Sequence, residues 1–350
     1  MSTFDFITPA RIVFGLGRRQ EAGMLARSLG KRAFVVCGSR TLAASGTVEK
    51  LMKSLKRDGV RVRPLYEISH EPLVEDVDRC FDRLHAQGAG EGDLLLAIGG
   101  GSAIDLAKAA AAMFADRQSA TVADYLEGVG KGLPIVRRPL PVLAMPTTAG
   151  TGAEATKNAV ISSYNPPFKK SMRSELMVPP AVLVDPELSV GVPPAATAAT
   201  GLDAITQLIE SYVSRFARPL TRALAVEGLR MAIPALPEAV RDGSSRPARE
   251  AMAHAALLSG IALTNSGLGL AHGVAAGLGV HARVAHGMAC AVMLPVALRV
   301  NRAQCQREFA ELARSALGID SHDDSAAADA LIQAIDELTA NIGIPRRLRD

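Results

Sequence analysis

The amino-acid sequence predicts an α/β domain built on a parallel sheet, followed by an all-helical domain. Over residues 1–190, short β-rich or apolar runs alternate with segments of helical periodicity, and one fully apolar run leads straight into three glycines. Over residues 191–350, the chain is rich in Ala and Leu at helical spacing and has no convincing strand pattern. Alternating strands and helices are typical of a parallel sheet, because each parallel crossover needs an intervening helix.

The elements of the first domain are expected where short apolar runs are bounded by turn residues. Residues 94–98 (LLLAI) are apolar throughout, which is typical of a strand covered on both faces. We expect strands at 33–37, 60–66, 94–98 and 141–145, and helices ending near 55 and covering 74–87 and 106–114. The prolines at 193 and 194 favour the start of the second domain, since proline is tolerated in the first turn of a helix.

Composition and charge exclude several classes of protein. The chain has 350 residues, 48% of them hydrophobic, so it can bury a large core and is not intrinsically disordered. The net charge of +4 comes from scattered basic residues, and aromatic residues make up only 4%, so we expect neither a nucleic-acid nor a membrane surface. The N-terminus lacks the apolar core of a signal peptide, and the four cysteines lack paired spacing. We therefore expect reduced thiols and a cytoplasmic location.

A phosphate-binding turn is expected directly after the fully apolar run. Gly99, Gly100 and Gly101 are followed by Ser102 and by a helix that contains Asp105. Glycine lets the backbone approach a ligand closely, and the N–H groups at the start of a helix favour an anion. The spacing is not the GxGxxG fingerprint, so the alternative is an ordinary strand-to-helix turn capped by Ser102. The position at the carboxyl end of a buried strand favours the pyrophosphate of a dinucleotide.

A second loop of the same kind follows the strand expected at 141–145. Residues 146–154 (PTTAGTGAE) interleave hydroxyl residues with glycine, and Thr147, Thr148 and Thr151 are the candidate cofactor contacts. Alone, this segment reads equally well as an ordinary Thr/Gly loop. Two such loops after two buried strands favour a dinucleotide-binding domain.

A polar stripe runs along the amphipathic helix expected at 199–213. Asp203, Thr206, Gln207 and Glu210 share one side of this helix, opposite its large apolar residues. Most polar stripes face water. This one carries no Lys or Arg, which counts against a solvated face.

Two histidines, His272 and His286, follow the polar stripe in the chain. On one straight helix they would lie about 21 Å apart, too far to share an ion. Residues 277–279 (GLG) are expected to break the helix and turn the chain back. Together with Asp203, the two imidazoles would then make a ligand set for catalytic Zn²⁺ or Fe²⁺ with an open coordination position. The alternative is a pair of structural histidines.

Several stretches, taken together and in order, resemble the iron-containing alcohol dehydrogenase family. They are RIVFGLG, GGGSAIDLAKA, PTTAGTGAEAT, VLVDPEL, ATGLDAITQLIE and the segment from His272 to HGMACAVMLP. The resemblance covers nearly the whole chain and implies a dinucleotide-binding α/β domain followed by a helical domain that carries the metal, the dehydroquinate synthase-like fold. We also expect a homodimer or a higher homo-oligomer. The chain stops at Asp350, whereas the family usually continues with further helix.

The resemblance also implies a ligand set. The family binds its metal with an aspartate, a histidine one turn later and two further histidines, which points to Asp203, His272 and His286 in this chain. Gln207 stands in place of the first histidine. We expect it to assist, either through its amide oxygen or by hydrogen bonding to a water on the metal.

Further positions match or depart from the family's cofactor and proton-transfer residues. Ala276 replaces a frequent proton-transfer histidine, so His281, water or a substrate hydroxyl would take that role. Lys170 matches a lysine near the cofactor. Ser39, followed by Arg40, stands where many members carry an aspartate that selects NAD. A hydroxyl and a guanidinium favour the 2′-phosphate, so we expect that NADP(H) is accepted as well as, or in preference to, NAD(H).

The activity implied by the resemblance is metal-assisted hydride transfer between NAD(P) and a small alcohol or aldehyde. Other enzyme readings are a maleylacetate reductase and, in a different reaction class, a dehydroquinate synthase type. A glycerol dehydrogenase type fits less well, because its histidines are spaced differently. The non-enzyme alternative is a degenerate dinucleotide-binding protein that has lost its metal, which Gln207 and Ala276 would favour.

Overall fold

A computed structural model describes residues 3–38, 42 and 45–348 of the chain. The chain divides into two compact units. The sheet unit comprises Thr8–Thr148 and Ala153–Leu188, and the helical unit comprises Met1–Ile7, Ala149–Gly152 and Ser189–Asp350. Ser39, the candidate cofactor contact, lies outside the described residues together with Arg40.

A parallel sheet forms the centre of the sheet unit, which confirms the predicted fold class. Its six strands lie in the order β1-β8-β5-β4-β2-β3, with parallel pairing throughout. β4 is buried at every position, as the apolar run predicts. The strands are β1 (Arg11–Phe14), β2 (Arg32–Gly38), β3 (Arg61–Ile68), β4 (Asp93–Gly99), β5 (Val142–Pro146) and β8 (Ala181–Val184).

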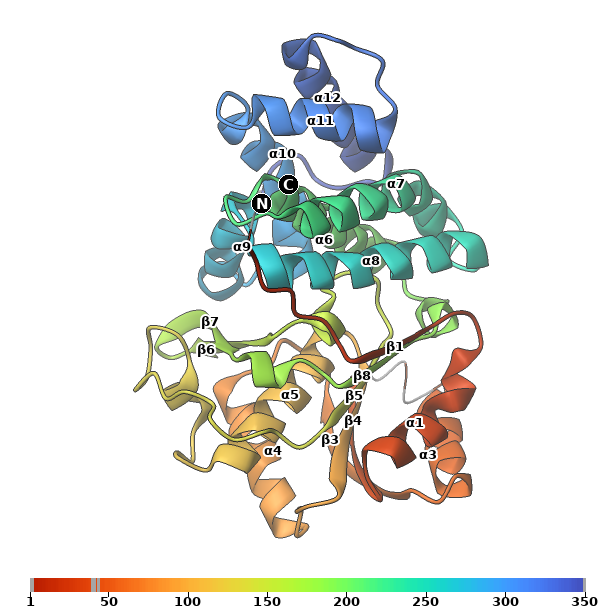
Figure 1. Ribbon diagram of the computed structural model, residues 1–350, viewed down its shortest axis with the longest axis vertical. Coiled ribbons are helices and arrows are strands. Elements are labelled where there is room, and N and C mark those ends of the chain that lie inside the picture. Colours follow the sequence, from red (N-terminus) through yellow and green to blue (C-terminus); the bar gives the residue numbers. More distant parts are fainter. Residues whose placement is uncertain (1–2, 39–41, 43–44, 349–350) are drawn as a thin grey trace. The chain divides into compact units, whose positions relative to one another are not determined.

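Helices cover both faces of this sheet (Figure 1). Successive side chains of a strand point to opposite faces, so Leu96 of β4 packs into the core beneath α1 and α3 and Leu95 into the core beneath α4 and α5. Both faces of the strand therefore need apolar residues, which explains the unbroken apolar run. The helices are α1 (Ala22–Leu29), α3 (Thr47–Arg57), α4 (Val74–Ala86) and α5 (Gly101–Asp116), with short 3₁₀ turns η1 (Arg18–Glu21), η2 (Val122–Tyr125), η3 (Ala153–Ala155), η4 (Glu175–Met177) and η5 (Pro186–Ser189).

An antiparallel hairpin follows the second loop and was not expected from the sequence. It consists of β6 (Asn158–Tyr164) and β7 (Pro167–Arg173). The buried Lys108 of α5 ties this segment down, because its ammonium group donates to the carbonyl oxygens of Ala153 and Asn158 and to the hydroxyl of Thr156. Asp105, one turn earlier on α5, accepts a hydrogen bond from the backbone N–H of Val160.

The helical unit is built from the seven helices described after β8. Its core is formed by apolar faces of α6, α7 and α8, joined by residues of α10, α11 and α12. No helix among the described residues combines the length and the apolar character needed to cross a membrane. The helices are α6 (Pro194–Val213), α7 (Pro219–Arg241), α8 (Arg246–Ser266), α9 (Leu270–His281), α10 (His286–Asn301), α11 (Gln306–Leu317) and α12 (Asp324–Asn341).

Part of the Thr/Gly loop packs closely on α8 within the helical unit. Gly152 has a φ of +58°, and a Cβ added there would lie 2.5 Å from the Cα of Gly260. A Cβ added to Gly260 would lie 2.2 Å from the carbonyl oxygen of Gly152. Only glycine allows this approach at both positions. The contact fixes residues 149–152 against the helix.

Candidate metal centre and cofactor loops

The polar stripe of α6 faces the interior of the helical unit. Asp203 is 1% exposed, Gln207 2% and Glu210 5%, and Thr206 is fully buried. Buried polar groups need partners. Thr206 donates to the carbonyl oxygen of Leu202 on α6 itself, whereas the partners of Asp203, Gln207 and Glu210 include residues of α8, α9 and the start of α10.

The two histidines reach Asp203 through a chain reversal. His272 lies in the first turn of α9, and His286 is the first residue of α10. The expected break at residues 277–279 is wrong, because these residues continue α9 to His281. Glycine costs only about 1 kcal/mol inside a helix, which packing can offset. The reversal falls at residues 282–285, where Arg283 adopts a φ of 55°.

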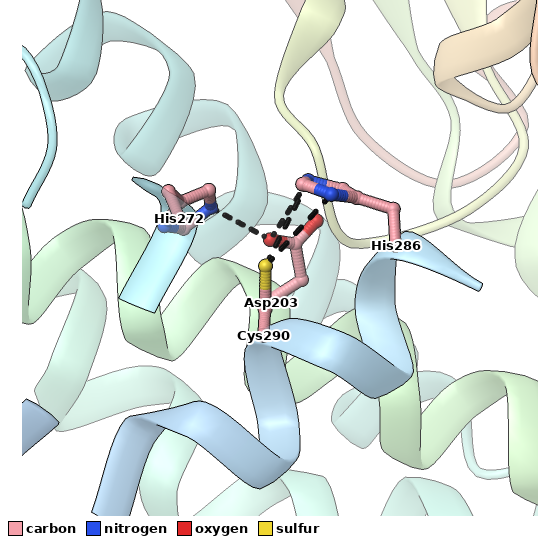
Figure 2. A group of neighbouring side chains, drawn as sticks. All are labelled: Asp203, His272, His286 and Cys290. Atoms are coloured by element: carbon pink, nitrogen blue, oxygen red, sulfur yellow. Dashed lines mark hydrogen bonds and ion pairs between the residues drawn. The ribbon is translucent and has the colours of Figure 1, made fainter. Parts of the chain in front are cut away.

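Asp203 lies between the two imidazoles (Figure 2). Its Oδ1 atom is 3.1 Å from Nε2 of His272 and 3.7 Å from Nε2 of His286. Ligand atoms around a tetrahedral zinc ion are about 3.5 Å apart, given metal–ligand bonds of about 2.0–2.3 Å. The two separations from Asp203 are therefore close to those around a shared ion, and one donor atom from each of the three side chains lies within 4.8 Å of the others.

Glu210 contacts the ring of His272 on the side away from Asp203. Its Oε2 atom lies 2.7 Å from Nδ1 of His272, while Oε1 accepts a hydrogen bond from the backbone N–H of Ala271. Gly269 leaves room for this carboxylate, since a Cβ there would lie 2.9 Å from Oε1. A carboxylate on one ring nitrogen orients the other nitrogen toward a metal. Sequence reasoning placed Glu210 in the polar stripe without assigning it this role.

Both the oxygen and the nitrogen of the Gln207 amide have hydrogen-bonding partners. Its oxygen accepts a hydrogen bond of 2.7 Å from the hydroxyl of Ser259 on α8, and its nitrogen lies 3.4 Å from Oδ1 of Asp203. The amide N–H side, rather than the oxygen, therefore faces the Asp203 carboxylate.

Cys290 joins the cluster, and sequence reasoning missed it. It lies one turn after His286 on α10, is fully buried, and its sulfur is 3.8 Å from Nε2 of His286. One ligand atom from each of Asp203, His272, His286 and Cys290 fits within a mutual separation of 4.8 Å. The signal in the sequence was the spacing of four residues from His286, which places both side chains on one helix face.

The carboxyl group of Asp203 is ionised in this setting. Burial alone would raise its pKa, but the neighbouring His286 and His272 outweigh burial and hold the pKa below its ordinary value. With Glu210 behind His272, two acidic side chains flank one imidazole. The centre is thus rich in negative charge and in nitrogen and sulfur donors.

His281 is not brought to this cluster. It is exposed at the C-terminal end of α9, nine residues beyond His272. Nine residues of helix correspond to about 13 Å along its axis.

In the sheet unit, the glycine turn begins where β4 ends. Gly99 has a φ of +156°, and a Cβ there would lie 2.8 Å from the Cα of Gly38 on β2. Gly100 is the N-cap of α5, and no side chain of a described residue caps this helix. Ser102 is therefore inside the first turn and not the cap. The N–H groups of that turn are oriented as an anion site requires.

The other predicted cofactor contacts are distributed between the two units. The backbone N–H of Thr147 donates to the carbonyl oxygen of Gly99, which joins the two loops at the end of the sheet. Thr148 belongs to the sheet unit and Thr151 to the helical unit. Asp105 is 9% exposed and bonded to β6, whereas Lys170 is exposed on β7.

A cavity of about 350 Å³ lies in the sheet unit, with Ile98, the residue before Gly99, in its lining. Ile98 and Met145, near the carboxyl ends of β4 and β5, line it together with Arg19, Lys50 and Arg57. In parallel α/β sheets, ligands bind at the carboxyl ends of the strands. Of the basic groups in this lining, Arg19 pairs with Asp185 and Glu187, and Arg57 pairs with Asp58.

Comparisons with known proteins cover both units. A family model described as iron-containing alcohol dehydrogenase matches residues 9–186, and a model described as Fe-containing alcohol dehydrogenase family, C-terminal, matches residues 197–350.

Individual relatives agree with the family models. A long-chain-alcohol dehydrogenase 1 from Geobacillus thermodenitrificans is 33% identical over 97% of this chain and 86% of the relative. An NAD-dependent methanol dehydrogenase from Bacillus methanolicus is 33% identical over 97% of this chain and 87% of the relative. The crystal structure of a 1,3-propanediol oxidoreductase superposes with a TM-score of 0.91 at 32% identity, covering 100% of this chain and 89% of that one.

Proposed function

The chain belongs to the iron-containing alcohol dehydrogenase family and is an NAD(P)-dependent oxidoreductase of CH–OH groups, and we propose that Asp203, His272 and His286 hold its divalent metal. The observation that carries this proposal is the convergence of a buried carboxylate and two partly buried imidazoles from α6, α9 and α10 within metal-binding distance.

The donor set fits the metal. Carboxylate and imidazole suit Zn²⁺ and Fe²⁺, and three such ligands leave a coordination position for substrate. Glu210 supplies the outer partner that metal-bound histidines usually have. A pair of purely structural histidines would not need Asp203 and Glu210 buried on either side of one ring.

The roles of the chain's own residues follow from this geometry. When bound, the metal supplies a Lewis acid for the substrate oxygen and the nicotinamide supplies or accepts a hydride. Asp203 and the histidines fix where that substrate oxygen lies, and Glu210 keeps the ring of His272 from turning away. From its place at the end of α9, His281 serves the reaction only by relaying a proton through water.

The cofactor is proposed to bind at the carboxyl end of the sheet. The uncapped start of α5 after Gly99, Gly100 and Gly101 would hold the pyrophosphate. The cavity lined by Ile98, near the carboxyl end of β4, supports binding of a nucleotide there. Ser39 and Arg40, outside the described residues, lead us to propose that NADP(H) is accepted as well as, or in preference to, NAD(H).

The substrate is proposed to be a small alcohol or aldehyde. The relatives reported above are named for a long-chain alcohol and for methanol, and the similar crystal structure for 1,3-propanediol. We further propose a cytoplasmic homo-oligomer of two or more chains. The four cysteines, all unpaired as disulfides, support a reducing compartment.

The test is a turnover screen of purified protein with both nicotinamides. Metal-stripped protein is assayed with a series of primary alcohols, diols and aldehydes, with and without added Fe²⁺ or Zn²⁺. The proposal expects turnover only after metal is added. Turnover that is equal in the stripped and reloaded protein would contradict a catalytic metal, and cofactor binding without any turnover would favour the degenerate protein.

A further inference from the structure

Cys290 lies beside the three predicted ligands, close enough to share an ion with them. Its sulfur is directed at Asp203 and His286 (Figure 2), and the residue also packs against Ala275 and Ala289. The sulfur lies 3.8 Å from Nε2 of His286, close to the 3.7 Å between that nitrogen and Oδ1 of Asp203. Across the four residues, one donor atom from each lies within 4.8 Å of the others, which is close enough for one ion to contact all four.

Gln207 does not provide a fourth ligand in this conformation. Its oxygen, the atom that could bind a metal, already accepts the hydroxyl of Ser259 at 2.7 Å. Its nitrogen faces Asp203, and an amide N–H group donates and has no acceptor capacity. The residue that stands in the family's histidine position therefore acts as a hydrogen-bonding neighbour of Asp203.

We propose that Cys290, as a thiolate, is the fourth protein ligand of the metal and that it biases the site toward Zn²⁺ over Fe²⁺. This inference rests on the proposed function. Soft thiolate ligands favour zinc. With four protein ligands, the substrate oxygen would enter as a fifth ligand, an expansion that catalytic zinc sites allow. The thiol proton leaves to solvent when the sulfur–metal bond forms. The thiolate and the Asp203 carboxylate then balance the two positive charges of the ion.

The helical geometry supports this assignment. His286 and Cys290 are four residues apart on α10, so their side chains lie one above the other on the same face. Asp203 approaches from α6 and His272 from α9, which puts the four donors on three separate helices. The competing reading is a buried cysteine that only fills space between Ala275 and Ala289.

An absorption spectrum of the cobalt-substituted protein distinguishes a metal-binding Cys290 from a space-filling one without relying on activity. Purified protein is stripped, loaded with Co²⁺ and scanned for the near-ultraviolet thiolate-to-cobalt charge-transfer band. We expect the band in the wild type and in Cys305→Ser, a control cysteine of the same unit, and its loss in Cys290→Ser. We also expect Cys290→Ser to lower Zn²⁺ affinity by more than the roughly 100-fold typical of losing an outer-shell partner.

The outcomes distinguish this inference from the proposed function beneath it. Cobalt bound at one ion per chain without the band, or with a band that survives in Cys290→Ser, overturns the thiolate ligand and leaves the metal centre standing. Failure of the wild type to bind Co²⁺ or Zn²⁺ overturns both. If Cys290→Ser does not fold, X-ray absorption of the zinc-loaded wild type decides, since a thiolate ligand adds one sulfur at about 2.3 Å.

Discussion

Glu210 and His272 form a buried pair, with Oε2 of the carboxylate 2.7 Å from Nδ1 of the ring. Glu210 lies on the side of the imidazole opposite Asp203, whose Oδ1 is 3.1 Å from Nε2 of His272. The ring is thus fixed between two carboxylates from the same helix. Because an outer partner orients the metal ligand, replacing the partner lowers the metal affinity, and that change can be measured.

Replacing this outer partner should weaken metal binding while leaving the ligands in place. We predict that Glu210→Gln lowers metal affinity about 10–100-fold, because a neutral amide orients the ring without enhancing its basicity. Competition with a chromophoric chelator measures this affinity. Glu337→Gln, an exposed change on α12, serves as the control. Equal affinity in wild type and Glu210→Gln would show that the carboxylate has no part in the metal centre.

The contact between Gly152 and Gly260 should be intolerant of any side chain. We predict that Gly260→Ala destabilises the helical unit by about 2–4 kcal/mol, since its Cβ would lie 2.2 Å from a backbone oxygen that cannot move alone. Chemical denaturation followed by circular dichroism measures the change. Gly273→Ala, where no atom lies within 4 Å of the added carbon, is the matched control in α9. A Gly260→Ala variant as stable as that control would refute the close approach.

Glu154 predicts a pH dependence of stability in the sheet unit. Burial raises the pKa of this carboxyl group to about 7, above the 4.5 of an unperturbed glutamate. A folded-state pKa above the unfolded value means that the folded state binds the proton more tightly. The stability that Glu154 contributes is therefore fully present below about pH 4.5 and is lost as the pH rises through 7.

Removing this titration should flatten the dependence. We predict that Glu154→Gln matches the wild type near pH 5 and exceeds its stability near pH 8 by up to about 3 kcal/mol. Urea denaturation at both pH values, with Glu91→Gln as an exposed control in the same unit, measures the difference. If Glu154→Gln is the less stable protein at pH 8, the ionised carboxylate is stabilising and this account of its burial is wrong.

Cofactor choice should respond to charge at position 39. We predict that Ser39→Asp lowers kcat/KM for NADPH by at least tenfold and leaves that for NADH within a few-fold, because a carboxylate repels the 2′-phosphate. Steady-state kinetics with both cofactors give the ratio, and Ser39→Asn controls for size without charge. A wild type that already prefers NADH a hundredfold would contradict the expectation for NADP(H).

The sequence predicted the features that depend on local pattern. The unbroken apolar run of β4 and the alternation of strands and helices require only neighbouring residues, and the structure has them. The hairpin of β6 and β7 was missed because its stability depends on partners from α5, notably Lys108 and Asp105. Such contacts leave no periodic signal in the sequence.

The residues of the metal centre likewise fall into those that the sequence predicted and those that it did not. Asp203, His272 and His286 were found through residue type and family resemblance, although the helix between the histidines ends at residue 281 and not at the glycines. Cys290 was overlooked because a single cysteine carries no pattern of its own, and only the reversal at 282–285 turns its helix toward Asp203. Gln207 lies in the polar stripe as predicted. However, the hydrogen bond from Ser259, which is distant in the chain, determines that the amide nitrogen faces the Asp203 carboxylate.

Metal content of His272→Ala tests the central claim most directly. Wild-type protein, His272→Ala and the exposed control His322→Ala are loaded with Zn²⁺ or Fe²⁺, dialysed and analysed for metal and for NAD(P)-linked turnover. The account predicts about one ion per chain in the wild type and the control, and loss of both the ion and turnover in His272→Ala. Retention of a full ion or of wild-type turnover in His272→Ala would contradict it.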